Sequence, residues 1–143
     1  MTPPDAILTA ALSGVPAGEA LDLAAGAGRH SLWLAQRRWK VTAIDIQPAE
    51  IPGVYFRQAD LEKHEYPIAP AAWDLIVCWL YWQPDILAGI AAGLRSGGVA
   101  AIAGKATGRF ATSLANFRIV FGEWTELVSG EDEVRAFLLA RKP

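Results

Sequence analysis

The chain has 143 residues, which suits a single domain with one hydrophobic core, so we expect residues 1–143 to form one domain. Apolar residues make up 52% and charged residues 20%, which predicts a packed globular protein and excludes a disordered one. The 13 basic and 15 acidic residues give a formal net charge of −2, so neither a nucleic acid nor an anionic membrane surface is an expected partner.

Other features of the sequence bear on the cellular compartment in which the protein is expected. No apolar stretch reaches the roughly 20 residues that span a bilayer, and the first residues lack the basic and apolar regions of a secretory signal. The single cysteine, Cys78, excludes an internal disulfide framework and fits a reducing compartment. We therefore expect a cytoplasmic protein. No spacing of His, Cys and carboxylate residues indicates a metal site.

The predicted elements alternate along the first half of the chain. A short helix is expected over residues 5–12, followed by a buried strand over 20–24 that closes in a glycine-bearing turn. A helix is predicted over 29–38, where basic residues near its end suit the helix dipole. Two further strands are expected over 41–46 and 54–58.

The alternation continues in the second half. A fourth strand over 73–80 is apolar on both faces, as a central parallel strand is. Pro84 begins a helix that runs to Leu94, Ser96 to Gly98 end it, and a fifth strand follows over 99–103. A core-facing helix and a closing antiparallel hairpin complete the chain. The helix is predicted from Phe110, Leu114, Phe117 and Phe121, and the hairpin strands cover 124–129 and 134–141.

This order of elements predicts an α/β fold. Strands that alternate with helices form a mostly parallel, Rossmann-like, doubly wound sheet, here with a C-terminal antiparallel hairpin. Two connections are unusually short. Residues 46–53 are too few for a crossover, which takes at least about 10–12 residues, and the prolines within 59–72 leave room for one or two helical turns.

The reduced connections affect how the sheet is covered. The strand over 54–58 should lie at the edge of the sheet, with Tyr55 and Phe56 on it. We expect a homodimer that buries the side of the second and third strands. The alternative is that the proline-rich segments 46–53 and 66–72 fold over that side of the sheet.

A glycine-rich turn after the first strand carries the main functional signal. Gly26 and Gly28 allow the backbone to approach a ligand closely, so a methyl group added at Gly28 is expected to obstruct that ligand. Asp22, just ahead of the turn, would repel a pyrophosphate but attract an ammonium or sulfonium group. This favours a cationic ligand over a nicotinamide dinucleotide. The alternative is a tight turn that Asp22 only caps.

Two more carboxylates are expected at the ends of the next strands. Asp45 ends the second strand, where it can accept hydrogen bonds from both hydroxyls of a ribose. Asp60 ends the third strand and can accept a hydrogen bond from an adenine amino group, with Leu61 packed on the base. For both aspartates the alternative is an ordinary residue that caps the following turn.

Taken in order, these segments resemble the motifs of class I S-adenosylmethionine-dependent methyltransferases. The first motif, with Ala24 where many members have glycine, most resembles the small tellurite-resistance-type branch. The resemblance implies a reduced class I methyltransferase fold, with S-adenosyl-L-methionine as cofactor and methyl transfer to a small-molecule acceptor as activity. The alternatives are a catalytically idle cofactor-binding regulatory or partner domain and a nicotinamide-dependent oxidoreductase. The matching segments are 22–29, 42–45, 59–61, 73–77 and 89–98.

The resemblance also implies roles for individual residues. The first carboxylate and the glycine turn would hold the amino acid part of the cofactor, and the second and third strand ends would hold its ribose and adenine. The end of the fourth strand would line the pocket beneath the sulfonium. The implied cofactor-binding residues are Asp22, Ala24, Gly26, Gly28, Asp45, Ile46, Asp60, Leu61, Cys78 and Trp79.

The sequence identifies no catalytic residue. Tyr81 and Trp82 are candidates, with Trp79, for an aromatic wall against the sulfonium or a planar substrate, and packing in the core is the alternative. Arg109, together with Lys105, is a candidate for binding an anionic substrate, and a solvated loop is the alternative. We interpret Cys78 itself as a small buried apolar residue.

Overall fold

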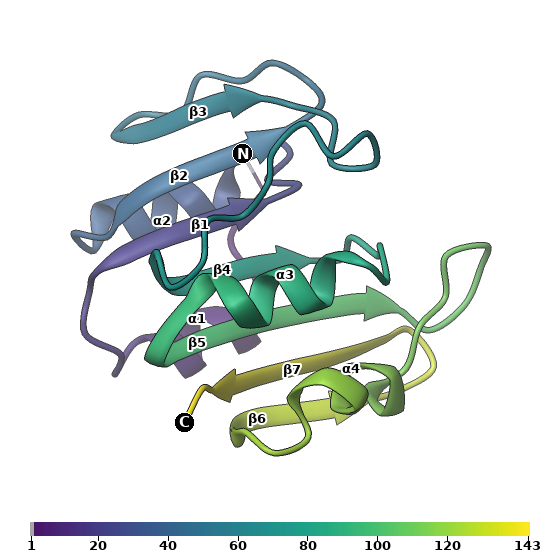
Figure 1. The fold of residues 1–143 in the computed structure, drawn as a ribbon. Coiled ribbons are helices and arrows are strands. Elements are labelled where there is room, and N and C mark those ends of the chain that lie inside the picture. Colours follow the sequence, from purple (N-terminus) through teal and green to yellow (C-terminus); the bar gives the residue numbers. More distant parts are fainter. Residues whose placement is uncertain (1) are drawn as a thin grey trace.

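A seven-stranded sheet forms the centre of the protein, in a computed structural model that describes residues 2–143 (Figure 1). The strand order is β3-β2-β1-β4-β5-β7-β6. Strands β1 to β5 pair in parallel, and β7 pairs antiparallel with both β5 and β6. This confirms the mostly parallel α/β sheet with an antiparallel C-terminal hairpin. The strands are β1 (Glu19–Leu23), β2 (Lys40–Asp45), β3 (Val54–Gln58), β4 (Trp73–Trp79), β5 (Leu94–Lys105), β6 (Thr125–Glu131) and β7 (Arg135–Arg141).

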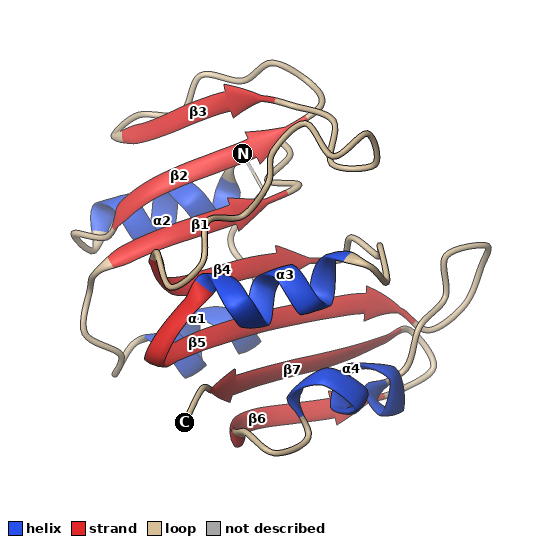
Figure 2. Cartoon of the chain, in the orientation of Figure 1, coloured by secondary structure: helices blue, strands red, loops and turns tan. Residues whose placement is uncertain are grey.

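Four helices cover the two faces of the sheet in pairs (Figure 2). On one face, α1 (Ala6–Leu12) and α2 (Arg29–Gln36) pack apolar side chains such as Leu8 and Leu34 against the strands. On the other face, α3 (Ile86–Gly93) and α4 (Leu114–Phe121) pack Ile90 and Phe117. None of the helices in the described part of the chain is long and apolar enough to cross a membrane.

The helix predicted to begin near Phe110 begins later. The hydroxyl of Ser113 accepts the N–H of Asn116 at 3.2 Å and caps α4, and the N–H of Thr112 is bonded to the carbonyl of Lys105 at 2.9 Å. Phe110 therefore lies in a loop and is 59% exposed, so its predicted place on the core face is wrong. Residues 96–98 belong to β5 rather than to a turn that ends α3.

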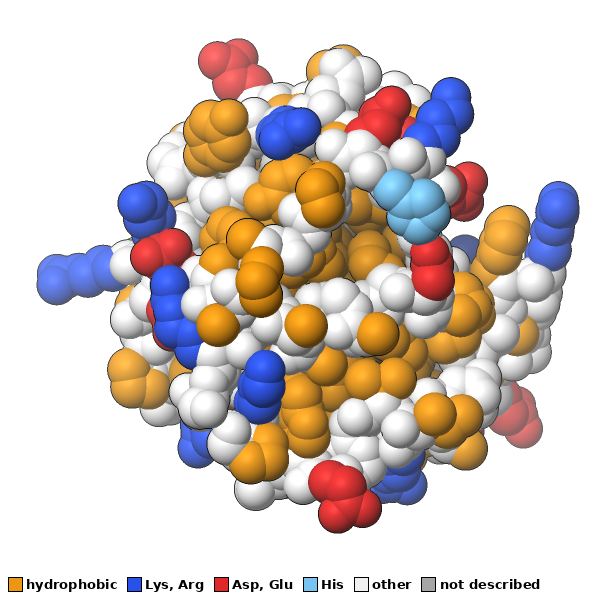
Figure 3. All heavy atoms as spheres, viewed as in Figure 1, with side chains coloured by type: hydrophobic (Ala, Val, Ile, Leu, Met, Phe, Trp, Pro, Cys, Tyr) orange, Lys and Arg blue, Asp and Glu red, His pale blue; other side chains and the backbone are white. Residues whose placement is uncertain are grey.

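The two short connections contain no helix in the described residues, and β3 is an edge strand, as expected. Both connections place apolar side chains inward: Ile51 is 4% exposed in the first, and in the second Leu61 is 7% exposed and Ile68 packs against the core on the α3 side. Tyr55 of β3 is 66% exposed. On the face drawn in Figure 3, apolar side chains gather over the centre and charged side chains stand mainly around the rim. The proline-rich segments thus contribute some of the missing cover.

Candidate functional site

The carboxyl ends of the parallel strands meet at one edge of the sheet, which is where open α/β sheets bind their ligands. Two pockets lie there, with volumes of about 240 Å³ and 680 Å³. Ala24, the first residue after β1, lines both. Its backbone has a positive φ of 55°, which turns the chain sharply between the two pockets.

The smaller pocket collects the predicted ribose and adenine residues. Asp45, Ile46, Asp60 and Leu61 all line it. Ile46 is 55% exposed, so its apolar side chain is available to pack on a flat ligand. Asp60 lies two residues beyond the end of β3, because that strand ends at Gln58 rather than at Asp60.

Asp45 already accepts two backbone hydrogen bonds. The N–H of Gly26 donates to one carboxylate oxygen at 3.0 Å, and the N–H of Gln47 donates to the other at 2.9 Å. These bonds fix the carboxylate at the end of β2 and tie it to the loop after β1. An ionised carboxylate offers about four lone-pair positions, so both oxygens can still accept a hydroxyl each.

The larger pocket contains a buried carboxylate. Asp22 is 2% exposed, and the hydroxyl of Ser31 in α2 donates to its Oδ2 at 2.6 Å. Burial raises the pKa of Asp22 to about 7, although the hydrogen bond from Ser31 opposes this, and the charge of Asp45 raises it further. Within residues 2–143 no cation pairs with Asp22. The pocket is therefore suited to a ligand that brings a positive charge.

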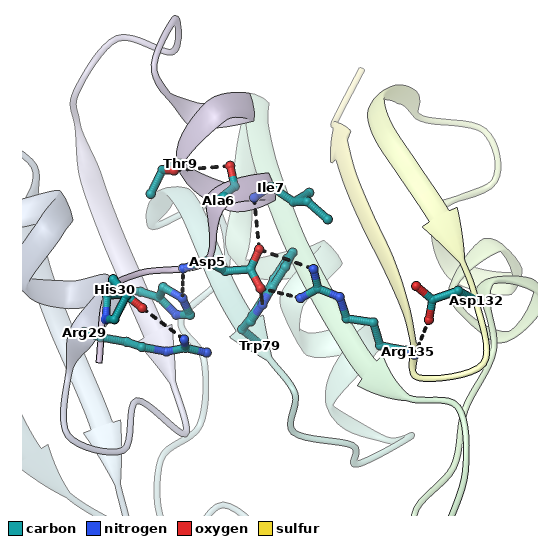
Figure 4. A network of polar contacts seen from close by, with 10 residues as sticks. Asp5, Ala6, Ile7, Thr9, Arg29, His30, Trp79, Asp132 and Arg135 are labelled. Atoms are coloured by element: carbon teal, nitrogen blue, oxygen red, sulfur yellow. Dashed lines mark hydrogen bonds and ion pairs between the residues drawn. The ribbon is translucent and has the colours of Figure 1, made fainter. Parts of the chain in front are cut away.

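His30 lines the larger pocket, and its ring lies beside the backbone of Asp5 (Figure 4). The ring Nε2 of His30 accepts the N–H of Asp5 at 3.2 Å. Burial, followed by the nearby Arg29 cation, lowers the pKa of His30 to about 4. The imidazole is thus neutral near pH 7 and its Nε2 is occupied, so His30 holds the N-terminal segment in place.

The two predicted glycines have different roles. Gly26 lines the larger pocket, has a φ of +60°, and has open space where a Cβ would lie. Gly28 has a φ of +89°, and a Cβ there would overlap the side chain of Ile51. A methyl group at Gly28 would therefore meet Ile51, and Gly28 lines neither pocket. That this methyl group obstructs the ligand stays a prediction.

The two predicted site residues at the end of β4, Cys78 and Trp79, differ in position: only Trp79 lines the larger pocket. Trp79 lines the larger pocket and donates its Nε1–H to Asp5 at 3.3 Å. Cys78 is 1% exposed, belongs to the core and lines neither pocket, so its expected place on the pocket wall is not observed. Burial raises the pKa of the Cys78 thiol to about 12, which removes it as a nucleophile near neutral pH.

A third pocket, of about 220 Å³, adjoins the other two and contains Tyr81 and Trp82. Tyr81 also lines the smaller pocket. Lys105 lines this third pocket, whereas Arg109 does not: Arg109 is exposed and lies 5.4 Å above the ring of Phe110.

Ser31 and Glu62 are among the residues of this region that sequence reasoning missed. Ser31 lies three residues after Gly28, in the first turn of α2 and behind Asp22, and this spacing was the available signal. Glu62 lines both the smaller and the third pocket, and its position two residues after Asp60 was the available signal.

The sequence itself shows the family. Residues 20–98, more than half of the chain, match the family described as "Methyltransferase domain". The chain therefore belongs to that family. Among curated proteins, none matches the sequence.

Solved structures show the same fold. The whole chain superposes on TehB from Haemophilus influenzae with a TM-score of 0.85 and 18% identity, and it spans 64% of that protein's length. The 1,6-didemethyltoxoflavin-N1-methyltransferase of Burkholderia thailandensis, solved with bound 1,6-didemethyltoxoflavin and S-adenosylhomocysteine, gives a TM-score of 0.71 at 22% identity, over 96% of this chain and 75% of that one. N-methyltransferase NodS from Bradyrhizobium japonicum, in complex with S-adenosylhomocysteine, gives 0.71 at 20% identity, over 96% of this chain and 84% of that one.

Proposed function

We propose that this protein binds S-adenosylmethionine and transfers its methyl group to a small-molecule acceptor. The observation that carries the proposal is the pair of pockets on either side of Ala24. One pocket has Asp45 and an exposed Ile46, which suit a ribose and a flat base, and the other has the buried Asp22 without a cation. An elongated ligand with a nucleoside at one end and an ammonium at the other matches both. The family match and the relatives solved with S-adenosylhomocysteine support the same cofactor.

Each residue then has a defined task. Asp45 accepts the ribose hydroxyls, Ile46 and Leu61 pack on the adenine, and Asp60 accepts its amino group. Asp22 and the backbone at Ala24 and Gly26 hold the amino acid part of the ligand, with Trp79 on the wall beside it. When bound, the cofactor supplies an electrophilic methyl group on a sulfonium.

The protein's contribution to the reaction is positioning and exclusion of water. Neither His30 nor Cys78 is placed to accept a proton, for the reasons given above. Transfer to an acceptor that already carries a lone pair needs no protein base, because orientation and desolvation lower the barrier.

Substitution of Asp45 tests the cofactor site. S-adenosylhomocysteine is expected to bind the wild-type protein, and Asp45→Ala is expected to weaken binding by about 1–3 kcal/mol, the typical value for a lost hydrogen bond to a charged group. Isothermal titration calorimetry measures both affinities. Asp132→Ala, at an exposed turn between β6 and β7, is the control and should bind like the wild type. An unchanged affinity for Asp45→Ala would remove Asp45 from the site.

We also propose a cytoplasmic location and a homodimer. The single Cys78, buried and unpaired, suits a reducing compartment. The open edge of β3, with Tyr55 largely exposed on it, is the surface through which a second copy would pair.

A further inference from the structure

The third pocket lies where a methyl acceptor has to bind if the proposed function holds. It shares Leu80 with the larger pocket, and Tyr81 and Glu62 with the smaller one. It is therefore adjacent to both ends of the proposed cofactor site. An acceptor seated there would approach the junction between the two other pockets, where the sulfonium of an elongated cofactor would lie.

The backbone of this pocket is held in place from two strands. Leu80, directly after β4, has a positive φ of 62°, an unusual conformation for a residue with a branched side chain. Its N–H donates to the carbonyl of Ala103 in β5 at 2.8 Å, which fixes it there. The loop after β5 closes through the bond from Thr112 N–H to the carbonyl of Lys105 at 2.9 Å. This loop carries both Lys105 and Phe110.

Aromatic side chains form the walls of the pocket. Tyr81, Trp82 and Phe110 line it together with Leu80. Trp82 is anchored from behind by Phe117 of the core, with ring centroids 5.9 Å apart. Phe110, in contrast, is 59% exposed and lines the pocket from the loop after β5. Walls of this kind favour a flat ring that stacks between them.

Two charged residues, Lys105 and Glu62, line the pocket. Lys105 lines only this pocket and pairs with no carboxylate in the described residues. Glu62 stands at the border with the smaller pocket. An anionic substituent is therefore favoured beside Lys105 and disfavoured on the cofactor side.

The pocket offers no phenolate base. The hydroxyl of Tyr81 donates to Gln83 at 2.6 Å, and burial, followed by the charge of Glu62, raises the pKa of Tyr81 to about 12. The acceptor must then carry its own lone pair at neutral pH, as the nitrogen of a pyridine-type ring does. Positive charge that develops on such a ring is stabilised by the surrounding aromatic faces.

We propose that the pocket formed by Glu62, Leu80, Tyr81, Trp82, Lys105 and Phe110 binds the methyl acceptor, and that this acceptor is a planar nitrogen heteroaromatic carrying one anionic group. The ring stacks against Trp82 and Phe110, and the anion faces Lys105. The ring nitrogen's lone pair forms the bond to the methyl carbon while the carbon–sulfur bond breaks. The electron pair of that bond stays on sulfur as a neutral thioether, and the positive charge passes to the ring. This inference rests on the proposed function.

Calorimetry with a matched pair of probes tests the binding. The full chain is first saturated with S-adenosylhomocysteine and then titrated with quinoline-3-carboxylate or with the neutral quinoline-3-carboxamide. Lys105→Met is expected to weaken binding of the carboxylate about fivefold, the upper range for one solvent-exposed ion pair, and to leave the carboxamide unchanged. Phe110→Ala, at an exposed position, is expected to weaken both probes about threefold to tenfold through lost stacking.

Controls and a transfer assay complete the test. Lys63→Met, at another exposed lysine, and Ile119→Ala, at an apolar residue 82% exposed on α4, should bind both probes like the wild type. With S-adenosylmethionine, mass spectrometry should show an N-methylated quinoline product. The inference is overturned if S-adenosylhomocysteine binds but neither probe does, if Lys105→Met affects both probes equally, or if only aliphatic thiols are methylated. Failure of S-adenosylhomocysteine itself to bind would instead overturn the proposed function.

Discussion

At the scale of single residues, the buried Asp22 connects the fold with the ligand. Its pKa, raised to about 7, means that the folded protein holds a proton there that the unfolded chain releases near the usual value of 3.8. Stability from this group is complete below about pH 3.8 and is lost as the pH rises through about 7. A bound cation would reverse that preference, because it stabilises the ionised carboxylate.

We therefore expect opposite pH dependences for stability and for cofactor binding. As the pH rises from 5.5 to 7.5, the free energy of unfolding of the cofactor-free protein should fall and its affinity for S-adenosylmethionine should rise. Asp22→Asn, which keeps the shape but not the charge, should flatten both trends. Urea unfolding and calorimetry at the two pH values measure them.

Ser31 supplies the matched control for Asp22. Ser31→Ala removes the hydrogen bond that lowers the pKa of the carboxylate, so the rise in affinity should shift to higher pH. The same pH profile in Ser31→Ala and in the wild type would contradict a positioning role for this hydroxyl.

The two glycines of the loop give a second prediction at this scale. Gly28→Ala should lower the free energy of unfolding by more than the roughly 1–2 kcal/mol expected from its left-handed backbone, because the new methyl group also overlaps Ile51. Gly26→Ala carries only the backbone cost, since nothing lies near its Cβ, yet it should weaken S-adenosylhomocysteine binding. Chemical denaturation and calorimetry on both variants distinguish the roles, and equal destabilisation would exclude the contact with Ile51.

At the scale of elements, one carboxylate joins three parts of the chain. Asp5 caps α1 by accepting the N–H of Ile7 at 3.0 Å, pairs with Arg135 of β7, and accepts the indole N–H of Trp79 at the end of β4 (Figure 4). Burial alone would raise the pKa of Asp5, but the hydrogen bonds from Arg135 and Ile7 outweigh it and lower the pKa. The contribution of this group to stability is present above the usual aspartate pKa and is lost as the pH falls through the lowered value.

Removal of the Arg135 cation should destabilise the N-terminal helix α1. Arg135→Met keeps an apolar stem but breaks the partly buried pair, and a loss of about 1–3 kcal/mol is expected. Hydrogen exchange of the α1 amides should accelerate with it. Arg118→Met breaks the more exposed pair with Glu126 and should lower the free energy of unfolding by less than Arg135→Met does. Equal losses for the two variants would show that Asp5 does not anchor α1.

The elements also show what sequence patterns can and cannot predict. The strands were predicted well because buried apolar runs such as Leu75–Trp79 are bounded by turn residues that are visible in the sequence. The start of α4 was missed because the spacing of apolar residues includes Phe110, whereas the helix begins after the Ser113 cap. The bond from Thr112 to Lys105 holds the preceding residues in a loop, and no periodicity records that contact. The surroundings of Gly28 and Cys78 could not be predicted from the sequence for a similar reason. The space around Gly28 is set by Ile51, which comes from a separate segment. The burial of Cys78 depends on how the other elements cover β4.

At the scale of the whole molecule, the β3 edge is the surface through which a second copy would pair. The outer edge of β3 has no neighbouring strand, and Tyr55 is 66% exposed on it, although Ile51 and Ile68 from the proline-rich connections cover part of the sheet. An edge strand with an exposed aromatic residue is able to pair with a second copy. A protein in which the connections alone complete the cover would stay monomeric.

We expect the wild-type protein to elute as a dimer at micromolar concentration, and light scattering coupled to gel filtration measures its mass. Tyr55→Lys places a charge on the edge strand and should give a monomer of about 15.4 kDa, because edge lysines oppose strand pairing. Ile119→Lys, at an apolar residue 82% exposed on α4, is the control and should remain dimeric. A wild-type mass of 15.4 kDa would refute the dimer and leave the two connections as the only cover of the sheet at this edge.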